Sequence, residues 1–123
     1  MYAGVRDLTV YQKAYALALD IYKESKVFPR EELYSLTDQI RRSSRSVAAN
    51  LAEAWKRRHY KKAFVSKLIE CSAEAAETEV WLDMAFDLGF LEGRTKDALL
   101  LRCVEIQKMI ESMIRQPEKF CPP

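Results

Sequence analysis

The stretch Leu33–Lys62, LYSLTDQIRRSSRSVAANLAEAWKRRHYKK, combines an apolar stripe, a cluster of cations and one asparagine among small residues. Apolar side chains recur along it at helical spacing, at Leu36, Ile40, Val47, Leu51 and Ala54. Residues three, four and seven positions apart lie on one side of an α-helix. The stretch therefore predicts an amphipathic helix whose stripe packs against the rest of the chain.

Asn50 stands beside this stripe, three residues after Val47 and four before Ala54. Alanines surround it, so a neighbouring helix can approach closely at this point. A polar amide on a packed face costs stability unless it is hydrogen-bonded, and its usual role is to fix register or the orientation of a partner. We interpret Asn50 as a structural polar residue of the core, with ligand binding as the alternative.

Three further segments show helical apolar patterns, and together with residues 32–57 they predict helices over residues 7–26, 61–88 and 95–115. In the first, the expected stripe is Leu8, Tyr11, Tyr15, Ala18 and Tyr22, with Ala14, Leu17 and Ile21 beside it. This arc is wide, which indicates a helix covered on more than one side. The third segment repeats its apolar residues every 3.5 positions, at Phe64, Leu68, Cys71, Ala75, Thr78, Leu82 and Ala85. That period is typical of helices packed nearly parallel to their neighbours.

Few residues break these helices. Pro29 excludes helical geometry from the residue before it, so we expect a turn at Phe28-Pro29 with Phe28 tucked under the bundle. Glu31 and Glu32 suit the start of the second helix, and the turn after it is placed at Arg58–Tyr60. Gly89 fits the left-handed residue that follows a helix, and Thr95 and either Asp7 or Thr9 are candidate caps. The fold class predicted is all-α: one domain, residues 1–123, forming an antiparallel up-down four-helix bundle with a tail at 117–123.

The charges are strongly segregated. Eight cations and one acid, Glu53, lie between Arg41 and Lys62, so this segment carries +7 whereas the whole chain is only +2. The segment Glu70–Glu92 carries −7, with seven acids and no Lys or Arg. Blocks of opposite charge of this kind indicate either internal pairing or interaction surfaces.

Several function classes find no support in the sequence. The only histidine, His59, has Lys56 three residues before it, which excludes the Glu-x-x-His pairs of di-metal bundles, and no second feature completes a Ser-His-Asp triad. There is no Gly-rich phosphate loop, no signal-like start and no apolar run approaching the roughly 20 residues that span a bilayer. Three cysteines without paired spacing, Cys71, Cys103 and Cys121, favour a reducing compartment. We expect a cytoplasmic protein that is not an enzyme and has no metal, cofactor or small-molecule substrate.

Four sequence patterns resemble a known family. They are L-x-V-x-x-x-A from Leu8, F-P-x-x-E-x-x-x-L from Phe28, Q-I-R-R-S-S-x-S-V-x-A-N-L-A-E over Gln39–Glu53, and E-A-x-E-T-x-x-W-L over Glu74–Leu82. Together they resemble the four-helix-bundle proteins related to those encoded in intervening sequences of bacterial 23S ribosomal RNA genes. Ala54 stands where that family commonly has glycine, and alanine extends the helix there.

The resemblance implies an up-down four-helix bundle that assembles as a homopentamer around an axis. It implies no established enzymatic activity. A distant relative, the accessory variability protein of diversity-generating retroelements, is also pentameric and binds reverse transcriptase and nucleic acid. Binding to RNA or DNA, or to a nucleic-acid-processing partner, is therefore one expectation for this chain.

Two functional hypotheses follow. In the first, an oligomeric interaction module contacts nucleic acid through a basic patch at the second turn, formed by Lys56, Arg57, Arg58, Lys61 and Lys62, with Trp55 and Tyr60 as nearby aromatic residues. In the second, the protein is a structural homo-oligomer or protein scaffold whose charged faces serve assembly only. The residues expected in charge pairing or oligomer contacts are Arg41, Arg42, Arg45, Glu74, Glu77 and Trp81. An antiparallel hairpin would bring Arg45 level with Glu74 and Arg42 level with Glu77.

Overall fold

A computed structural model describes residues 2–123 and shows four long helices. These are α1 (Thr9–Ser25), α2 (Leu36–Lys56), α3 (Lys61–Asp87) and α4 (Gly93–Arg115). Three short 3-10 turns, η1 (Val5–Asp7), η2 (Arg30–Glu32) and η3 (Pro117–Lys119), flank them, and no strand occurs within residues 2–123. The prediction of an all-α, four-helix fold is confirmed.

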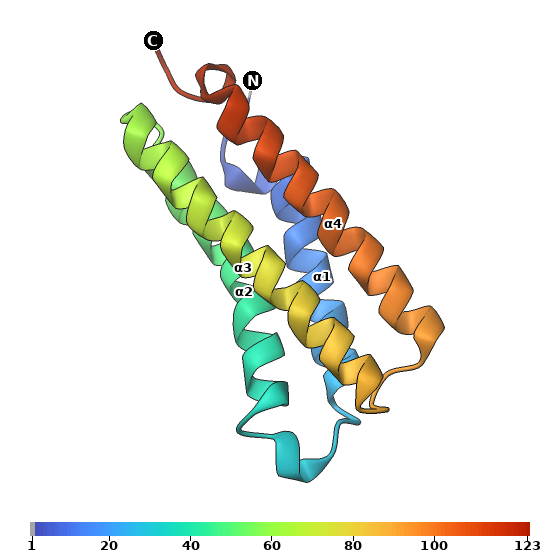
Figure 1. Ribbon diagram of the computed structural model, residues 1–123. Helices are drawn as coiled ribbons and strands as arrows, with labels where there is room; N and C mark the ends of the chain where they lie inside the picture. Colours follow the sequence, from blue (N-terminus) through green and yellow to red (C-terminus); the bar gives the residue numbers. More distant parts are fainter. Residues whose placement is uncertain (1) are drawn as a thin grey trace.

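The helices run alternately up and down, and each packs beside the next in the chain (Figure 1). α1 also packs against α4, which closes the bundle. One end of the bundle holds the α2–α3 turn and both termini, and the other holds the α1–α2 and α3–α4 connections (Figure 1). None of the helices in the described part of the chain is both long and apolar enough to cross a membrane.

α3 is the most completely buried element of the core. All seven residues of its predicted 3.5-residue stripe, from Phe64 to Ala85, are fully buried. The predicted stripe of α2 is buried as well, including Ala54, which lies inside the helix and not at a break. The two stripes form the part of the hydrophobic core in which α2, α3 and α4 meet.

α1 departs from its predicted orientation. Its buried residues are Val10, Ala14, Leu17, Ile21 and Ser25, the set that the sequence placed beside the stripe or left out of it. Tyr15 and Tyr22, predicted within the stripe, are 52% and 37% exposed. Compact aliphatic side chains fill a close-packed interior more readily than tyrosines, whose hydroxyl needs a polar partner when buried. The chain itself thus covers only one side of a wide apolar arc.

The helix ends differ from expectation at two places. α2 begins at Leu36, four residues after Glu32, because the carboxylate of Glu32 accepts hydrogen bonds from the Ser35 hydroxyl (2.5 Å) and the Leu36 N–H (3.2 Å). Glu32 therefore stabilises the first turn of α2 from the 3-10 turn that precedes the helix. α4 begins at Gly93, before Thr95, and α1 at Thr9, and neither has a side-chain cap. Gly89 has a φ of 85° after the end of α3, as predicted. Phe28 packs against Phe90, with ring centroids 5.8 Å apart.

A polar contact crosses the core between α2 and α3. The hydroxyl of Thr78 lies 2.9 Å from both the Ser43 hydroxyl and the Glu74 carbonyl oxygen. Within residues 2–123 no buried side-chain nitrogen or oxygen lacks a hydrogen-bond partner. A buried polar pair that is fully satisfied restricts the register of the two helices, since a shift would leave a hydroxyl unpaired.

The core predicts a large effect at Phe64, which is fully buried and packs against Phe120 at a ring-centroid distance of 6.3 Å. We expect Phe64→Ala to lower the free energy of unfolding by about 3–5 kcal/mol, because the truncation leaves a cavity. Val27→Ala is the control, since Val27 is 78% exposed and its truncation should change stability by less than about 0.5 kcal/mol. Urea denaturation followed by circular dichroism measures both, and equal midpoints would contradict the assigned core.

Candidate functional site

The basic patch predicted around the second turn lies at the end of the bundle that holds both chain termini. α2 ends at Lys56, and the turn is closed by hydrogen bonds from the Arg57 N–H to the Ala54 carbonyl (2.9 Å) and from the Tyr60 N–H to the Arg57 carbonyl (2.9 Å). The turn is therefore at the predicted position. Its tight geometry places five cations within seven residues, Lys56, Arg57, Arg58, Lys61 and Lys62.

Two of these five cations have partners within the chain. The guanidinium of Arg58 stacks over the Trp55 ring at 4.3 Å and donates to the Trp55 carbonyl at 2.9 Å. Lys61 Nζ lies 3.7 Å from Glu118 of the C-terminal turn. Both contacts tie the turn to the bundle, so these two side chains contribute to its structure.

The other three cations, Lys56, Arg57 and Lys62, are exposed and make no ion pair with residues 2–123. We call them the free basic cluster. Exposed cations that repel one another at one end of a molecule attract a polyanion more effectively than cations that are already neutralised by acids. Of the five predicted nucleic-acid-binding residues, these three are best placed for phosphates.

The aromatic residues near the turn have different environments. Trp55 is buried and packs edge-on against Tyr2, with ring centroids 5.8 Å apart, so it cannot stack on a base. Tyr60 is 76% exposed between the free cations. Base stacking on an exposed aromatic ring is one of the two means by which proteins hold single strands. Tyr60 is the more exposed of the two exposed tyrosines described at this end, since Tyr2 is 45% exposed and packs on Trp55 and Phe120.

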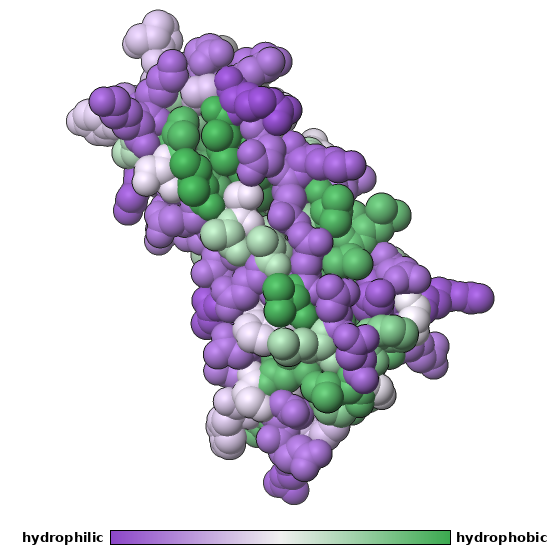
Figure 2. Space-filling model, viewed as in Figure 1, coloured by the Kyte–Doolittle hydropathy of each residue, from purple (hydrophilic) through white to green (hydrophobic). Residues whose placement is uncertain are grey.

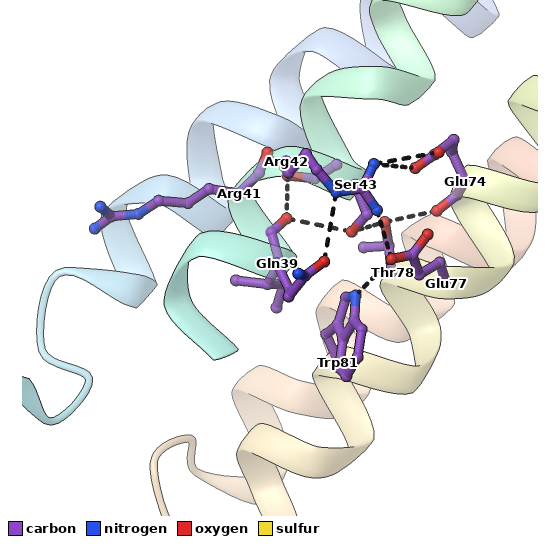
Figure 3. A network of polar contacts seen from close by, with 10 residues as sticks. Gln39, Arg41, Arg42, Ser43, Glu74, Glu77, Thr78 and Trp81 are labelled. Atoms are coloured by element: carbon purple, nitrogen blue, oxygen red, sulfur yellow. Dashed lines mark hydrogen bonds and ion pairs between the residues drawn. The ribbon is translucent and has the colours of Figure 1, made fainter. Parts of the chain in front are cut away.

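Three of the residues predicted to pair by charge, Arg42, Glu74 and Glu77, form ion pairs between α2 and α3. Arg42 donates to both carboxylate oxygens of Glu74 at 3.3 Å and to Glu77 at 2.5 Å, and Trp81 Nε1 donates to the same Glu77 oxygen at 3.3 Å (Figure 3). The hydrogen bond that Arg42 donates to Glu77 is the main cause of a raised pKa for Arg42. These four side chains form one network along the seam between the two helices.

Arg41 and Arg45 do not join this network. Arg41 points away from α3 toward α1 (Figure 3), where its Nε donates to the Ser25 hydroxyl at 2.7 Å. The guanidinium carbons of Arg41 and Arg45 lie 4.7 and 5.7 Å from the centre of the Tyr22 ring. The pairing expected between Arg45 and Glu74 is absent because the buried stripe of α2 rotates Arg45 to the side of the helix that faces α1.

Closer to the turn, Glu53 forms a further ion pair between α2 and α3. Lys67 Nζ lies 2.7 Å from the Glu53 carboxylate and 3.5 Å from that of Glu70. The hydrogen bond between Lys67 and Glu53 lowers the pKa of Glu53 and raises the pKa of Lys67. The single acid of the basic segment thus forms its ion pair with Lys67 of α3, and the charge of Arg57 acts on the Glu53 carboxylate only at longer range.

Asn50 is half-buried on α2 and lies outside the most buried stripe. The sequence predicted a polar residue of the core, and the structure gives Asn50 an intermediate exposure on α2, apart from the buried residues of that helix. The cysteines Cys71 and Cys103 are buried, and burial raises the pKa of each thiol to about 12. Their Sγ atoms donate to backbone carbonyls of the neighbouring helix, Val47 and Ala75, at 3.1 and 3.2 Å. They are small core side chains with no reactive character.

No set of three or more His, Cys, Asp or Glu side chains is grouped for metal binding in the described part of the chain. The arrangement instead offers a cation cluster at one end and two helix faces with unpaired charges.

Comparison with known proteins agrees with the resemblance that the sequence motifs carry. Residues 6–112 match the model of a family described as 23S rRNA-intervening sequence protein. The chain belongs to this family. A comparison with curated proteins finds no match. The four helices of this 23S rRNA-intervening sequence protein agree with the fold that the sequence resemblance implied.

A solved structure is similar to this member of the 23S rRNA-intervening sequence protein family. It is the crystal structure of a protein of unknown function from the S23 ribosomal protein family of Bacteroides thetaiotaomicron. The two chains are 28% identical, the match covers 87% of this chain and 96% of that chain, and the TM-score is 0.79. The similarity thus extends through the bundle.

The pKa shifts of the Glu53–Lys67 pair predict a pH dependence of stability. Because the pKa of Glu53 is lowered in the fold, its contribution is present above its ordinary value of 4.5 and is lost as the pH falls through the lowered pKa. Because the pKa of Lys67 is raised in the fold, its contribution is fully present below its ordinary value of 10.5 and is lost as the pH rises through the raised pKa. We therefore expect Glu53→Gln to differ most from wild type in unfolding free energy between these limits, with the difference shrinking in acid.

Chemical denaturation at a series of pH values measures this difference. Glu31→Gln is the control, because Glu31 is exposed and makes no ion pair with residues 2–123. A Glu53→Gln difference that stayed constant down to strongly acidic pH would show that the pair does not form.

Proposed function

We propose that the protein is a non-catalytic, self-associating interaction module that binds the phosphate backbone of nucleic acid through its free basic cluster. The observation that carries this proposal is the presence of three exposed cations, Lys56, Arg57 and Lys62, without acidic partners at one end of the bundle. A protein that neutralises phosphates with such cations releases counterions, and its affinity depends strongly on salt.

Self-association would increase the effect of this small cluster. Three cations on one chain make a weak site, but copies of the chain joined side by side would present several clusters to the same strand. Linked sites bind with an avidity far above that of each site alone. The homopentamer implied by the sequence resemblance is one such arrangement, and Tyr60 would add a stacking surface to each cluster.

A structural oligomer without nucleic-acid binding is the second candidate. It is supported by the exposed apolar side chains of α1 and α3, which the single chain leaves uncovered. In this case the cations and acids would serve the assembly and the choice of partner copies. The two candidates share the assembly and differ in the role of the basic cluster.

Binding to single-stranded RNA over a range of salt concentrations tests the proposal. The variant Lys56→Gln/Arg57→Gln/Lys62→Gln removes the three free cations and leaves Arg58 and Lys61 with their partners. We expect it to bind at least about tenfold more weakly at low salt, and the slope of log affinity against log salt should fall by roughly 2, or about 0.7 for each lost phosphate contact.

The matched control removes three exposed cations at the other end of the bundle, in Lys23→Gln/Arg30→Gln/Arg94→Gln. Its net charge equals that of the first variant, so a general effect of charge would weaken both equally. Wild-type protein that ignores RNA and DNA at low salt, or equal losses in both variants, would refute nucleic-acid binding by the cluster and favour the structural oligomer.

A further inference from the structure

An apolar groove about 520 Å³ in volume runs between α1 and α2 on the outside of the bundle. Tyr15, Leu19 and Tyr22 line it from α1, and Ala48, Ala49 and Ala52 line it from α2. We call this surface the α1–α2 groove. Its α2 side consists of small side chains, so a helix laid against it can come close to the backbone, as ridges of one helix pack into grooves of another.

A second apolar surface follows the outward side of α3, opposite its buried stripe. Exposed side chains recur there every three or four residues, at Ile69, Ala73, Ala76, Val80 and Met84. The three larger ones, Ile69, Val80 and Met84, are between 46% and 55% exposed. We call this surface the α3 ridge. Figure 2 shows apolar side chains along α3 between hydrophilic ones on this face of the molecule.

The two surfaces carry opposite charges at their borders. Arg41 and Arg45 lie at the α1–α2 groove around Tyr22, and neither makes an ion pair with residues 2–123. Asp83 and Asp87, three residues after Val80 and Met84, border the α3 ridge and are likewise exposed and without an ion pair in the described chain. Complementary charge steers and orients association between surfaces of this kind.

We propose that the α3 ridge of one copy of this chain docks in the α1–α2 groove of a second copy. This inference rests on the self-association in the proposed function and names the surfaces that make it. Apolar side chains of the ridge would cover the side of α1 that its own chain leaves exposed. Asp83 and Asp87 would come near Arg41 and Arg45, whose charges have no counterpart in their own bundle.

The geometry of this contact sets the kind of assembly. The groove and the ridge are different surfaces, so each docked copy still offers one unoccupied groove and one unoccupied ridge. Head-to-tail contacts of this type close into a ring or continue as an open filament, depending on the rotation between copies, in contrast to a two-fold contact, which stops at a dimer. In a closed ring the basic clusters of all copies would lie at one end of the assembly.

Two variants that each disable one surface test the proposal. Ala49→Glu/Ala52→Glu places charge in the groove, and Ile69→Glu/Val80→Glu places charge on the ridge. We expect each variant alone to have the mass of one chain by light scattering, because one surface is missing from every copy. An equimolar mixture should form a one-to-one dimer, in which the intact ridge of one variant occupies the intact groove of the other.

The matched control is Val27→Glu/Leu101→Glu, which adds the same charge at two positions that are 78% and 71% exposed and outside both surfaces. It should keep the wild-type mass, and circular dichroism should show native helix content in all variants. Variants that keep the wild-type mass, or a mixture that stays monomeric, would overturn the docking while leaving self-association intact. Wild-type protein that is monomeric at every concentration would overturn both the docking and the self-association. RNA binding by the basic cluster is measured in a separate experiment.

A groove variant that loses RNA binding while it keeps the wild-type mass would assign the groove to nucleic acid and would also overturn the docking. The light-scattering and RNA-binding measurements on the same preparations thus separate the two occupants.

Discussion

The packing of α3 is the constraint on which the rest of this structure depends. Seven of its residues, at a 3.5-residue period from Phe64 to Ala85, are fully buried between α2 and α4. A helix buried so completely along one stripe cannot rotate without exposing apolar area, and burial of Phe64, Leu68 and Leu82 contributes about 1.5–3 kcal/mol each. The Ser43–Thr78 contact restricts its axial register at the same time. The direction of every other side chain on α2 and α3 follows from these two restraints.

That fixed rotation divides the cations of α2 into two groups. Arg42 faces α3 and is neutralised by Glu74 and Glu77, whereas Arg41 and Arg45 face α1 and meet the Tyr22 ring. Arg42 is only one residue from Arg41 and three from Arg45, yet Arg42 alone of the three is paired with acids. Exposed ion pairs contribute little to stability, about 0–1 kcal/mol each, so the pattern of pairing says more about available surfaces than about folding energy. In the proposed assembly, the unpaired cations are the ones that meet a second copy.

Much of the fold follows from the sequence, because helical periods and turn residues act locally. The α3 stripe, the turn after Lys56 and the left-handed Gly89 were all predictable from spacing and residue type. The orientation of α1 was not. Its apolar arc is wide enough to fit two stripes, and only packing against α2 and α4 decides that Ala14, Leu17 and Ile21 point inward. The charge pairs were also predictable only in part. Sequence spacing places Arg45 and Glu74 at the same level along the bundle, but it does not give the rotation of α2 that turns Arg45 toward α1. The burial of Trp55 and the pairing of Lys61 also depend on tertiary contacts, with Tyr2 and Glu118 contributed by the two ends of the chain.

We infer that one side of α1 packs in its own bundle and that a second copy covers the other side. Hydroxyl-radical footprinting of the tyrosines across a dilution series measures whether this second side becomes covered. We expect Tyr15 and Tyr22 to become protected as the protein assembles, while Tyr34, which is 91% exposed and outside the proposed contact, stays reactive. Tyr15 and Tyr22 that remain as reactive in the assembled protein as in the dilute chain would contradict it.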